Sequence, residues 1–123
     1  RVALESPKPL VVDADALHAL PAIEAAFRAR EIPKILTPHP GEAGVLLGVS
    51  AREINENRFE SVQHLAQKYG AIVVLKGART LTATPDGRIW VNLSGNAGMA
   101  TGGSGDVLTG TIAGLLAQTE NAE

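Results

Sequence analysis

The 123-residue sequence contains no cysteine, few aromatic side chains and no excess of basic residues. Without cysteine there is no disulfide framework, thiol nucleophile or cysteine-based metal site. The net charge of -2 gives no basic surface for nucleic acid, and 3% aromatic residues provide few platforms for stacking bases. No apolar run approaches the length of a membrane span, and the N-terminus does not resemble a signal peptide. We therefore expect a cytoplasmic protein without nucleic-acid or membrane partners.

The composition that remains is typical of a globular protein, with 45% hydrophobic and 20% charged residues. Apolar runs predict strands at residues 9–13, 34–36 and 71–75, and a hairpin joins 81–84 to 88–92 around Pro85-Asp86-Gly87. Helical patterns separate the first three strands. This order predicts a single α/β layered domain, in which helices flank a mainly parallel central sheet.

The longest of these helical patterns begins at Ser50, which forms a capping box with Glu53. The pattern continues to Tyr69, and Gly70 ends it. Its polar residues are interpreted mostly as a solvated face, made of Arg58, Glu60, Gln63, His64, Gln67 and Lys68.

A glycine-rich segment, residues 96–106, leads into a helix from Val107 to Ala117. The glycines allow the backbone to approach a ligand closely, and the free N–H groups of a helix start favour an anion, most often phosphate. One face of the helix is predicted to be apolar and comprises Leu108, Ile112, Leu115 and Leu116.

Asp106 is unexpected at such an anion site, because its carboxylate would repel a bound phosphate. We interpret Asp106 as a base that takes a proton from a hydroxyl, while the N–H groups of the loop hold the developing negative charge. The alternative is that Ser104 or Asp106 only caps the helix.

Three further segments follow predicted strands, at the edge where α/β sheets bind ligands. Asp13 or Asp15 is expected to face substrate or a metal-bound water, with turn hydrogen bonds as the alternative. Two prolines stiffen the segment 37–42 and present His39. Glu42 either helps to order Mg²⁺ through water or complements the dipole of the next helix.

In the segment 76–80, a lysine and an arginine flank a glycine-containing turn, which suits a nucleotide phosphate; a basic hairpin turn is the alternative.

These segments carry a family resemblance. The run Gly-Asn-x-Gly-Met-Ala-Thr-Gly-Gly-Ser-Gly-Asp-Val-Leu-Thr-Gly at residues 95–110 resembles the signature of NAD(P)HX dehydratases, also called the YjeF C-terminal domain, within the ribokinase-like superfamily. Asp-Ala-Asp-Ala-Leu at 13–17, Thr-Pro-His-x-Gly-Glu at 37–42 and Leu-Lys-Gly-x-x-Thr at 75–80 resemble further elements of the family. The resemblance covers most of the chain, from Leu10 to Gln118, and implies a ribokinase-like fold of which residues 1–123 are the central part, truncated at both ends.

The implied activity is the nucleotide-dependent dehydration of (S)-NADHX or (S)-NADPHX to NADH or NADPH. Phosphate is released together with AMP from ADP, which we favour, or with ADP from ATP, and Mg²⁺ is the implied cofactor. By resemblance, Asp106 is catalytic and contacts NAD(P)HX together with His39 and Asn96, and Glu42 orders the metal through water. The implied nucleotide-binding residues are Lys76, Gly77, Ala78, Arg79, Thr80, Gly102, Gly103, Ser104 and Gly105.

Two other functions stay open on the residues alone. One is a kinase of the same superfamily acting on a vitamin precursor such as a hydroxymethylpyrimidine, a thiazole or pyridoxal. His39 favours the dehydratase, because sugar kinases of the superfamily tend to have Asn there. The other is a non-catalytic nucleotide-binding module. The sequence also leaves open a homo-oligomer, and an NAD(P)HX epimerase domain in the full-length parent.

Overall fold

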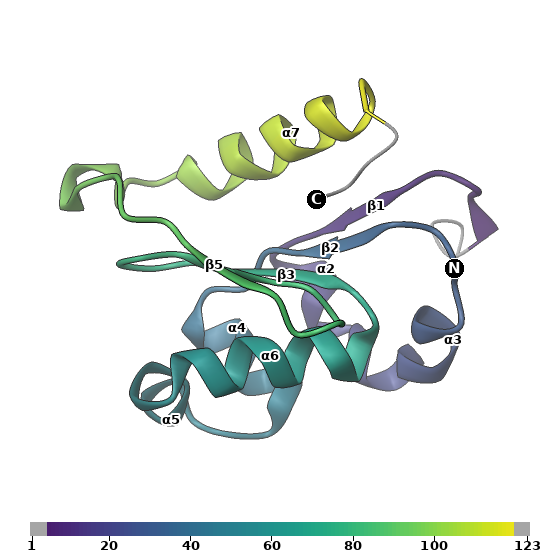
Figure 1. Cartoon of the computed structure of the whole chain (residues 1–123), viewed down its shortest axis with the longest axis horizontal. Coiled ribbons are helices and arrows are strands. Elements are labelled where there is room, and N and C mark those ends of the chain that lie inside the picture. The colour runs from purple at the N-terminus through teal and green to yellow at the C-terminus, as the bar shows by residue number, and fades with distance from the viewer. Residues whose placement is uncertain (1–4, 120–123) are drawn as a thin grey trace.

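The computed structural model describes residues 5–119, which form one mixed sheet with helices on both faces (Figure 1). The strand order is β1-β2-β3-β4-β5. Strands β1, β2 and β3 are parallel, with Val11 opposite Ile35 and Leu36 opposite Val73, whereas β4 and β5 extend the sheet as an antiparallel hairpin. The α/β class and the hairpin are confirmed. The strands are β1 (Leu10–Val12), β2 (Lys34–Leu36), β3 (Ile72–Leu75), β4 (Leu81–Ala83) and β5 (Ile89–Val91).

The described helices divide unequally between the two faces. In Figure 1, α7 lies on one face of the sheet, and the α-helices that precede it lie on the other. None of the described helices combines the length and apolarity needed to cross a membrane. The helices are α2 (Asp15–His18), α3 (Glu24–Arg28), α4 (Pro40–Leu47), α5 (Ala51–Glu56), α6 (Arg58–Tyr69) and α7 (Ser104–Leu116), with short 3-10 helices η1 (Leu20–Ile23) and η2 (Ala97–Met99).

The hydrophobic core lies between the sheet and the helices α2 to α6. Phe27 and Tyr69 pack edge to face in it, with ring centroids 6.3 Å apart. Alternate residues of β3, Val73 and Leu75, are fully buried against this layer, as the period of two in a strand requires. This core holds β1, β2 and β3 in register, so the residues that follow these strands are also fixed.

The predicted helix from Ser50 to Tyr69 is two helices, which is a correction. Its start is confirmed: the Ser50 hydroxyl accepts from the Glu53 N–H at 3.2 Å, and the Glu53 carboxylate accepts from the Ser50 N–H at 3.0 Å. The chain breaks at Asn57, whose φ and ψ are −130° and 48°. The backbone N–H of Asn57 donates to the carbonyl of Glu53, which is the last bond of α5, and its side-chain amide donates to the same carbonyl. Such a local side-chain bond competes with helix continuation.

The predicted solvated face of α6 is also only partly correct. Glu60, His64 and Gln67 are exposed, but longer side chains reach inward to backbone carbonyls. The Lys68 ammonium donates to the carbonyl of Leu46 at 2.8 Å. The other two are Gln63, which donates to Thr84, and Arg58, which donates to the end of β3. Such side chains can lay their apolar stems along the core and bond at the tip, so residue type alone did not reveal their direction.

Helix α7 forms, but it begins at Ser104 rather than at Val107, and its buried face is rotated from the predicted one. Leu116 is buried and Leu108 and Ile112 are half-buried, whereas Leu115 is 60% exposed. Thr109 takes a place on the inner face instead, beside β1. The apolar pattern therefore predicted the helix correctly and missed the polar residue in its inner face.

Candidate active site

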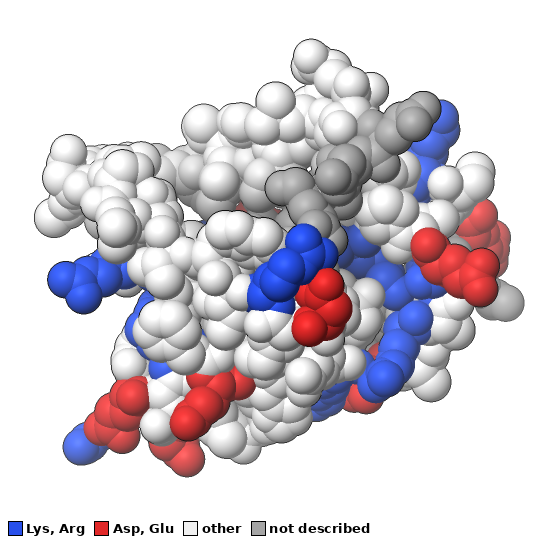
Figure 2. All heavy atoms as spheres, in the orientation of Figure 1, with Lys and Arg blue, Asp and Glu red and all other residues white. Residues whose placement is uncertain are grey.

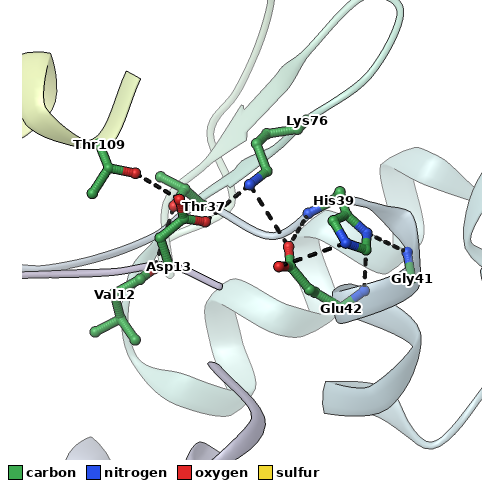
Figure 3. Close-up of polar contacts among 8 residues, drawn as sticks. All are labelled: Val12, Asp13, Thr37, His39, Gly41, Glu42, Lys76 and Thr109. Carbon is green, nitrogen blue, oxygen red and sulfur yellow. Dashed lines mark hydrogen bonds and ion pairs between the residues drawn. The ribbon is translucent and has the colours of Figure 1, made fainter. Parts of the chain in front are cut away.

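The carboxyl ends of the three parallel strands each lead directly into a polar residue. Asp13 follows β1, Thr37 follows β2 and Lys76 follows β3. Since parallel strands end at the same edge of a sheet, these residues gather in one place (Figure 3). Thr37 is buried, and its hydroxyl donates to the carbonyl of Val12 at 3.3 Å, which fixes the ends of β1 and β2 relative to each other.

Lys76 lies between two carboxylates at this edge. Its ammonium donates to Asp13 Oδ1 at 2.9 Å and lies 3.7 Å from Glu42 Oε2. Its side chain is 21% exposed, while those of Asp13 and Glu42 are nearly buried. The lysine predicted to face a nucleotide phosphate therefore already balances negative charge from β1 and α4, and a phosphate contact by it remains a prediction.

Asp13 links the sheet to α7. Its second oxygen, Oδ2, accepts from the Thr109 hydroxyl at 2.7 Å. Burial by itself raises the pKa of Asp13, but hydrogen bonds from Lys76, Thr109 and Thr37 outweigh burial and hold the pKa below the ordinary 3.8. Asp15, by contrast, is exposed in the first turn of α2.

His39 and Glu42 form a reciprocal cap at the start of α4. The imidazole Nδ1 accepts from the N–H groups of Gly41 at 2.9 Å and Glu42 at 3.2 Å. The Glu42 carboxylate accepts in turn from the His39 N–H at 2.7 Å. Because Nδ1 is an acceptor, the neutral imidazole carries its hydrogen on Nε2. The His39 side chain is 56% exposed, so this arrangement orients a ring that remains accessible to a ligand.

The surroundings of Glu42 do not fit a direct Mg²⁺ ligand. Its carboxylate serves the cap of α4 and faces the Lys76 ammonium, which repels a second cation. No group of three or more His, Cys, Asp or Glu side chains within residues 5–119 is arranged to hold a metal. These contacts favour the alternative of a first-turn acid that complements the helix, and a water-mediated metal contact stays a prediction.

The glycine-rich segment starts α7 without a side-chain cap. Gly103 is the N-cap residue, with φ of +84°, a conformation that favours glycine. The Ser104 hydroxyl donates backward to the carbonyl of Thr101 at 2.8 Å, so the alternative that Ser104 or Asp106 caps the helix is wrong. Among the described residues, the N–H groups of Gly105 and Asp106 have no acceptor. Such N–H groups at a helix start favour an anion.

The first turn of α7 lies against the charged residues of the sheet edge. A β-carbon at Gly105 would lie 3.8 Å from both Asp13 Oδ2 and Lys76 Nζ. The structure therefore places the glycine-rich segment next to the strand end at Asp13 and the start of the segment 76–80.

Asp106 is exposed in this first turn, and its carboxylate makes no hydrogen bond or ion pair with any residue that the structure describes. It is also the single charged residue between residues 89 and 119. Figure 2 shows α7 and the loop before it as a surface almost free of charge. An unpaired carboxylate beside free N–H groups is accessible to an incoming ligand, and the role of Asp106 as a base stays a prediction.

The segment 76–80 is a tight exposed turn, and we call it the nucleotide loop after its predicted role. Gly77 has φ of +129° and Arg79 has φ of +55°, which is unusual for a residue with a side chain. The Thr80 hydroxyl donates to the carbonyl of Gly77 at 3.1 Å. Gly77, Ala78 and Arg79 are exposed. These residues lie at the predicted sheet edge, and their contact with a nucleotide stays a prediction.

The remaining predicted residues belong to exposed loop backbone. Asn96 Oδ1 accepts from the Gly98 N–H at 2.9 Å and caps η2, so its carbonyl oxygen shapes the loop before α7. Gly102 and Gly103 are exposed. Contact of Asn96 with a substrate stays a prediction.

Two residues of the site were missed in the sequence. Thr109 bonds Asp13 from α7, and its polarity within an apolar helix, one turn after Gly105, was the available signal. Arg58 donates to the backbone at the end of β3, and no local pattern distinguishes it from its solvated neighbours.

The sheet, the glycine-rich start of α7 and the exposed aspartate in its first turn define the chain as a ribokinase-like α/β protein, an architecture it shares with a ribokinase-like superfamily protein of known structure. The model of the NAD(P)H-hydrate dehydratase family matches residues 1–123, and the chain belongs to that family.

Several similar proteins and solved structures carry names that agree with this family assignment. A bifunctional NAD(P)H-hydrate repair enzyme Nnr from Moorella thermoacetica is 53% identical over 89% of the chain and 21% of the relative. An ADP-dependent (S)-NAD(P)H-hydrate dehydratase from Neisseria meningitidis is 52% identical over 90% of the chain and 38% of the relative. The structure of the Bacillus subtilis ADP/ATP-dependent NAD(P)H-hydrate dehydratase, co-crystallized with ATP/Mg²⁺, is 40% identical with a TM-score of 0.86, covering 97% of this chain and 41% of that one. The chain thus spans less than half the length of these relatives.

Proposed function

We propose that the protein to which this chain belongs repairs hydrated nicotinamide nucleotides, converting (S)-NADHX or (S)-NADPHX to NADH or NADPH at the expense of ADP or ATP. The observation that carries the proposal is the first turn of α7, where an exposed, unpaired Asp106 lies next to the free N–H groups of Gly105 and Asp106. Membership in the family supports the choice of substrate. A relative named as ADP-dependent supports ADP as the donor.

The reaction follows from the roles of these groups. Asp106 accepts the proton of the substrate hydroxyl as the hydroxyl oxygen attacks the terminal phosphoryl group of ADP. The bond from that phosphorus to its bridging oxygen breaks and AMP leaves. The N–H groups at the start of α7 stabilise the negative charge that develops. The lone pair of the ring nitrogen then expels phosphate from the phosphorylated substrate, and loss of a ring proton restores the dihydropyridine.

The other residues bind and orient. We assign His39 and Asn96 to the hydrated nicotinamide nucleotide, and the nucleotide loop with residues 102–105 to the adenine nucleotide. Mg²⁺ is proposed to enter with the nucleotide and to neutralise phosphate charge, since it keeps much of its hydration and is usually held in part by substrate phosphates. A second activity in the whole protein, epimerisation of NAD(P)HX, is suggested by the relative named as bifunctional.

Product analysis separates this function from a vitamin-precursor kinase. The full-length protein is incubated with ADP or ATP, Mg²⁺ and either (S)-NADHX or a hydroxymethylpyrimidine, thiazole or pyridoxal acceptor, and phosphorus NMR follows the products. The dehydratase releases inorganic phosphate with (S)-NADHX and leaves the other acceptors unchanged. Accumulation of a stable phosphate ester of a vitamin precursor would establish the kinase instead.

A further inference from the structure

Arg58 is the first residue of α6, and its guanidinium reaches across to the end of β3. Nη2 donates to the carbonyl of Leu75 at 3.1 Å and to that of Lys76 at 3.3 Å, and Nη1 lies 3.5 Å from Asn55 Oδ1. We propose that Arg58 is a positioning residue that holds the nucleotide loop in its binding conformation and thereby sets the affinity for the adenine nucleotide. The inference rests on the nucleotide dependence proposed above.

The two carbonyls show why this contact fixes a conformation. Successive carbonyls of an extended strand point in opposite directions, so a single nitrogen cannot reach both while the strand continues straight. The bonds to Leu75 and Lys76 therefore require the chain to leave the strand direction between them. A charged donor makes such hydrogen bonds stronger than a neutral one does. Arg58 thus fixes the point at which β3 ends and the nucleotide loop begins.

Gly77 completes the contact from the loop side. Its φ of +129° favours glycine, and a β-carbon there would lie 3.1 Å from Arg58 Nη1 and 3.4 Å from Nη2. The backbone of the loop therefore lies directly on the guanidinium, at a distance that a side chain at residue 77 would disturb. The close packing of Arg58 therefore depends on the absence of a side chain at residue 77.

The loop is held on its other side by the backbone of the segment that contains His39. The Lys76 N–H donates to the carbonyl of Pro38 at 2.9 Å. The N–H of Lys76 is thus hydrogen-bonded to Pro38 and its carbonyl to Arg58. The exposed turn that follows Lys76 therefore begins at a residue whose backbone is fixed on both sides. Without Arg58 the carbonyls of Leu75 and Lys76 lose this donor, and the glycine at 77 frees the turn. Ordering the turn again would then cost binding free energy.

The test compares nucleotide and substrate binding in the full-length protein. Arg58→Lys keeps the charge but loses the planar fork, and Arg58→Met removes the donor. We expect the Kd for ADP, measured by calorimetry, to rise about tenfold in both variants. Methionine has no donor, and the lysine side chain is one atom too short to bring its ammonium to the place of Nη2. The KM for (S)-NADHX should change by less than about twofold, which is the usual size of effect for a substitution that does not touch the ligand. Arg52→Met is the matched control, because Arg52 is an exposed arginine that pairs with Glu56 within α5.

Gly77→Ala probes the same contact from the other partner and does not depend on the stability of an α6 variant. It should weaken ADP binding, and Arg58→Lys combined with Gly77→Ala should weaken it by less than the product of the two single effects, since both disturb one contact.

The outcomes separate the inference from the proposed function. A wild-type protein that binds neither ADP nor ATP would overturn both. Wild-type binding with an unchanged Kd in Arg58→Lys would overturn the inference alone, as would equal losses for ADP and (S)-NADHX, which would mean that Arg58 only ties α6 to β3. Selective loss of ADP affinity, with Arg52→Met unchanged, supports it.

Discussion

Asp106 and Asp13 are acidic residues near the same sheet edge, and their surroundings differ. Asp106 is exposed and has no partner within the described part of the chain. Asp13 is nearly buried and bonds Lys76 through one oxygen and Thr109 through the other. The unpaired carboxylate of Asp106 is suited to accept a proton from a ligand, as proposed above. Both oxygens of Asp13 are hydrogen-bonded, which suits a residue that links β1, β3 and α7.

Asp106→Asn is expected to lower turnover by about 10²–10⁴-fold, the usual contribution of a positioned general base, because an amide cannot accept the hydroxyl proton. ADP affinity should be retained, since the N–H groups of α7 remain. The measurement is kcat for NADH formation by the full-length protein, together with the Kd for ADP. Glu60→Gln, which changes an exposed acidic residue of α6, is the control and should match the wild type. Near-wild-type turnover in Asp106→Asn would remove the base role.

Asp13→Asn is expected to lower the free energy of unfolding at pH 7 by about 1–2 kcal/mol, since a charge-assisted hydrogen bond is lost. The pKa of Asp13 lies below 3.8 in the folded protein, so the stability contributed by its charge is present above that value and is lost as the pH falls through the folded pKa. Urea unfolding should therefore show the gap between wild type and variant narrowing as the pH falls from about 5 towards 3. A gap that stays constant over this range would contradict the prediction.

At the scale of the elements, local signals predicted those parts of the fold that short stretches of chain determine. The capping box at Ser50, the hairpin around residues 85–87 and the buried run of β3 all formed as predicted. The break at Asn57 was missed, because the sequence does not show whether an asparagine side chain points to solvent or bonds a carbonyl of the preceding turn, as Asn57 does with Glu53. The inner face of α7 was predicted wrongly at Leu115, because Thr109 faces the sheet in its place. Thr109 faces inward because its hydroxyl donates to the Asp13 carboxylate, a contact that the sequence of the helix does not show.

Lys34 illustrates the same limit, since the sequence marks it only as the start of a strand. Its ammonium is buried and donates to three carbonyls at the end of α3, those of Phe27 (3.1 Å), Arg28 (3.1 Å) and Arg30 (2.7 Å). Lys34→Met should destabilise the fold by about 2–3 kcal/mol, because these carbonyls lose a charged donor. Urea unfolding measures the loss, with the exposed Lys8→Met as control. Equal stability of the two variants would show that water replaces the ammonium.

At the scale of the whole molecule, the charges of the described residues are divided unevenly between the two faces of the sheet. The helices below the sheet carry acidic and basic residues, whereas the stretch from β5 through α7 carries Asp106 alone (Figure 2). The candidate active site lies where the two sides meet, because Asp13 and Lys76 come from the sheet edge and Gly105 and Thr109 from α7. The convergence of these segments could be predicted from the rule that parallel strands end at one edge. The pairing of Lys76 with two carboxylates could not, since it depends on side-chain directions across α4, β1 and β3.

The central claim is the nucleotide-dependent restoration of reduced nicotinamide, and absorbance at the reduced-nicotinamide band tests it most directly. The full-length protein is mixed with (S)-NADHX and Mg²⁺, first without nucleotide and then with ADP or ATP. We predict no rise without nucleotide, a rise on its addition, and release of one phosphate for each NADH formed. A rise that does not need nucleotide, or no rise with either ADP or ATP, would contradict the account.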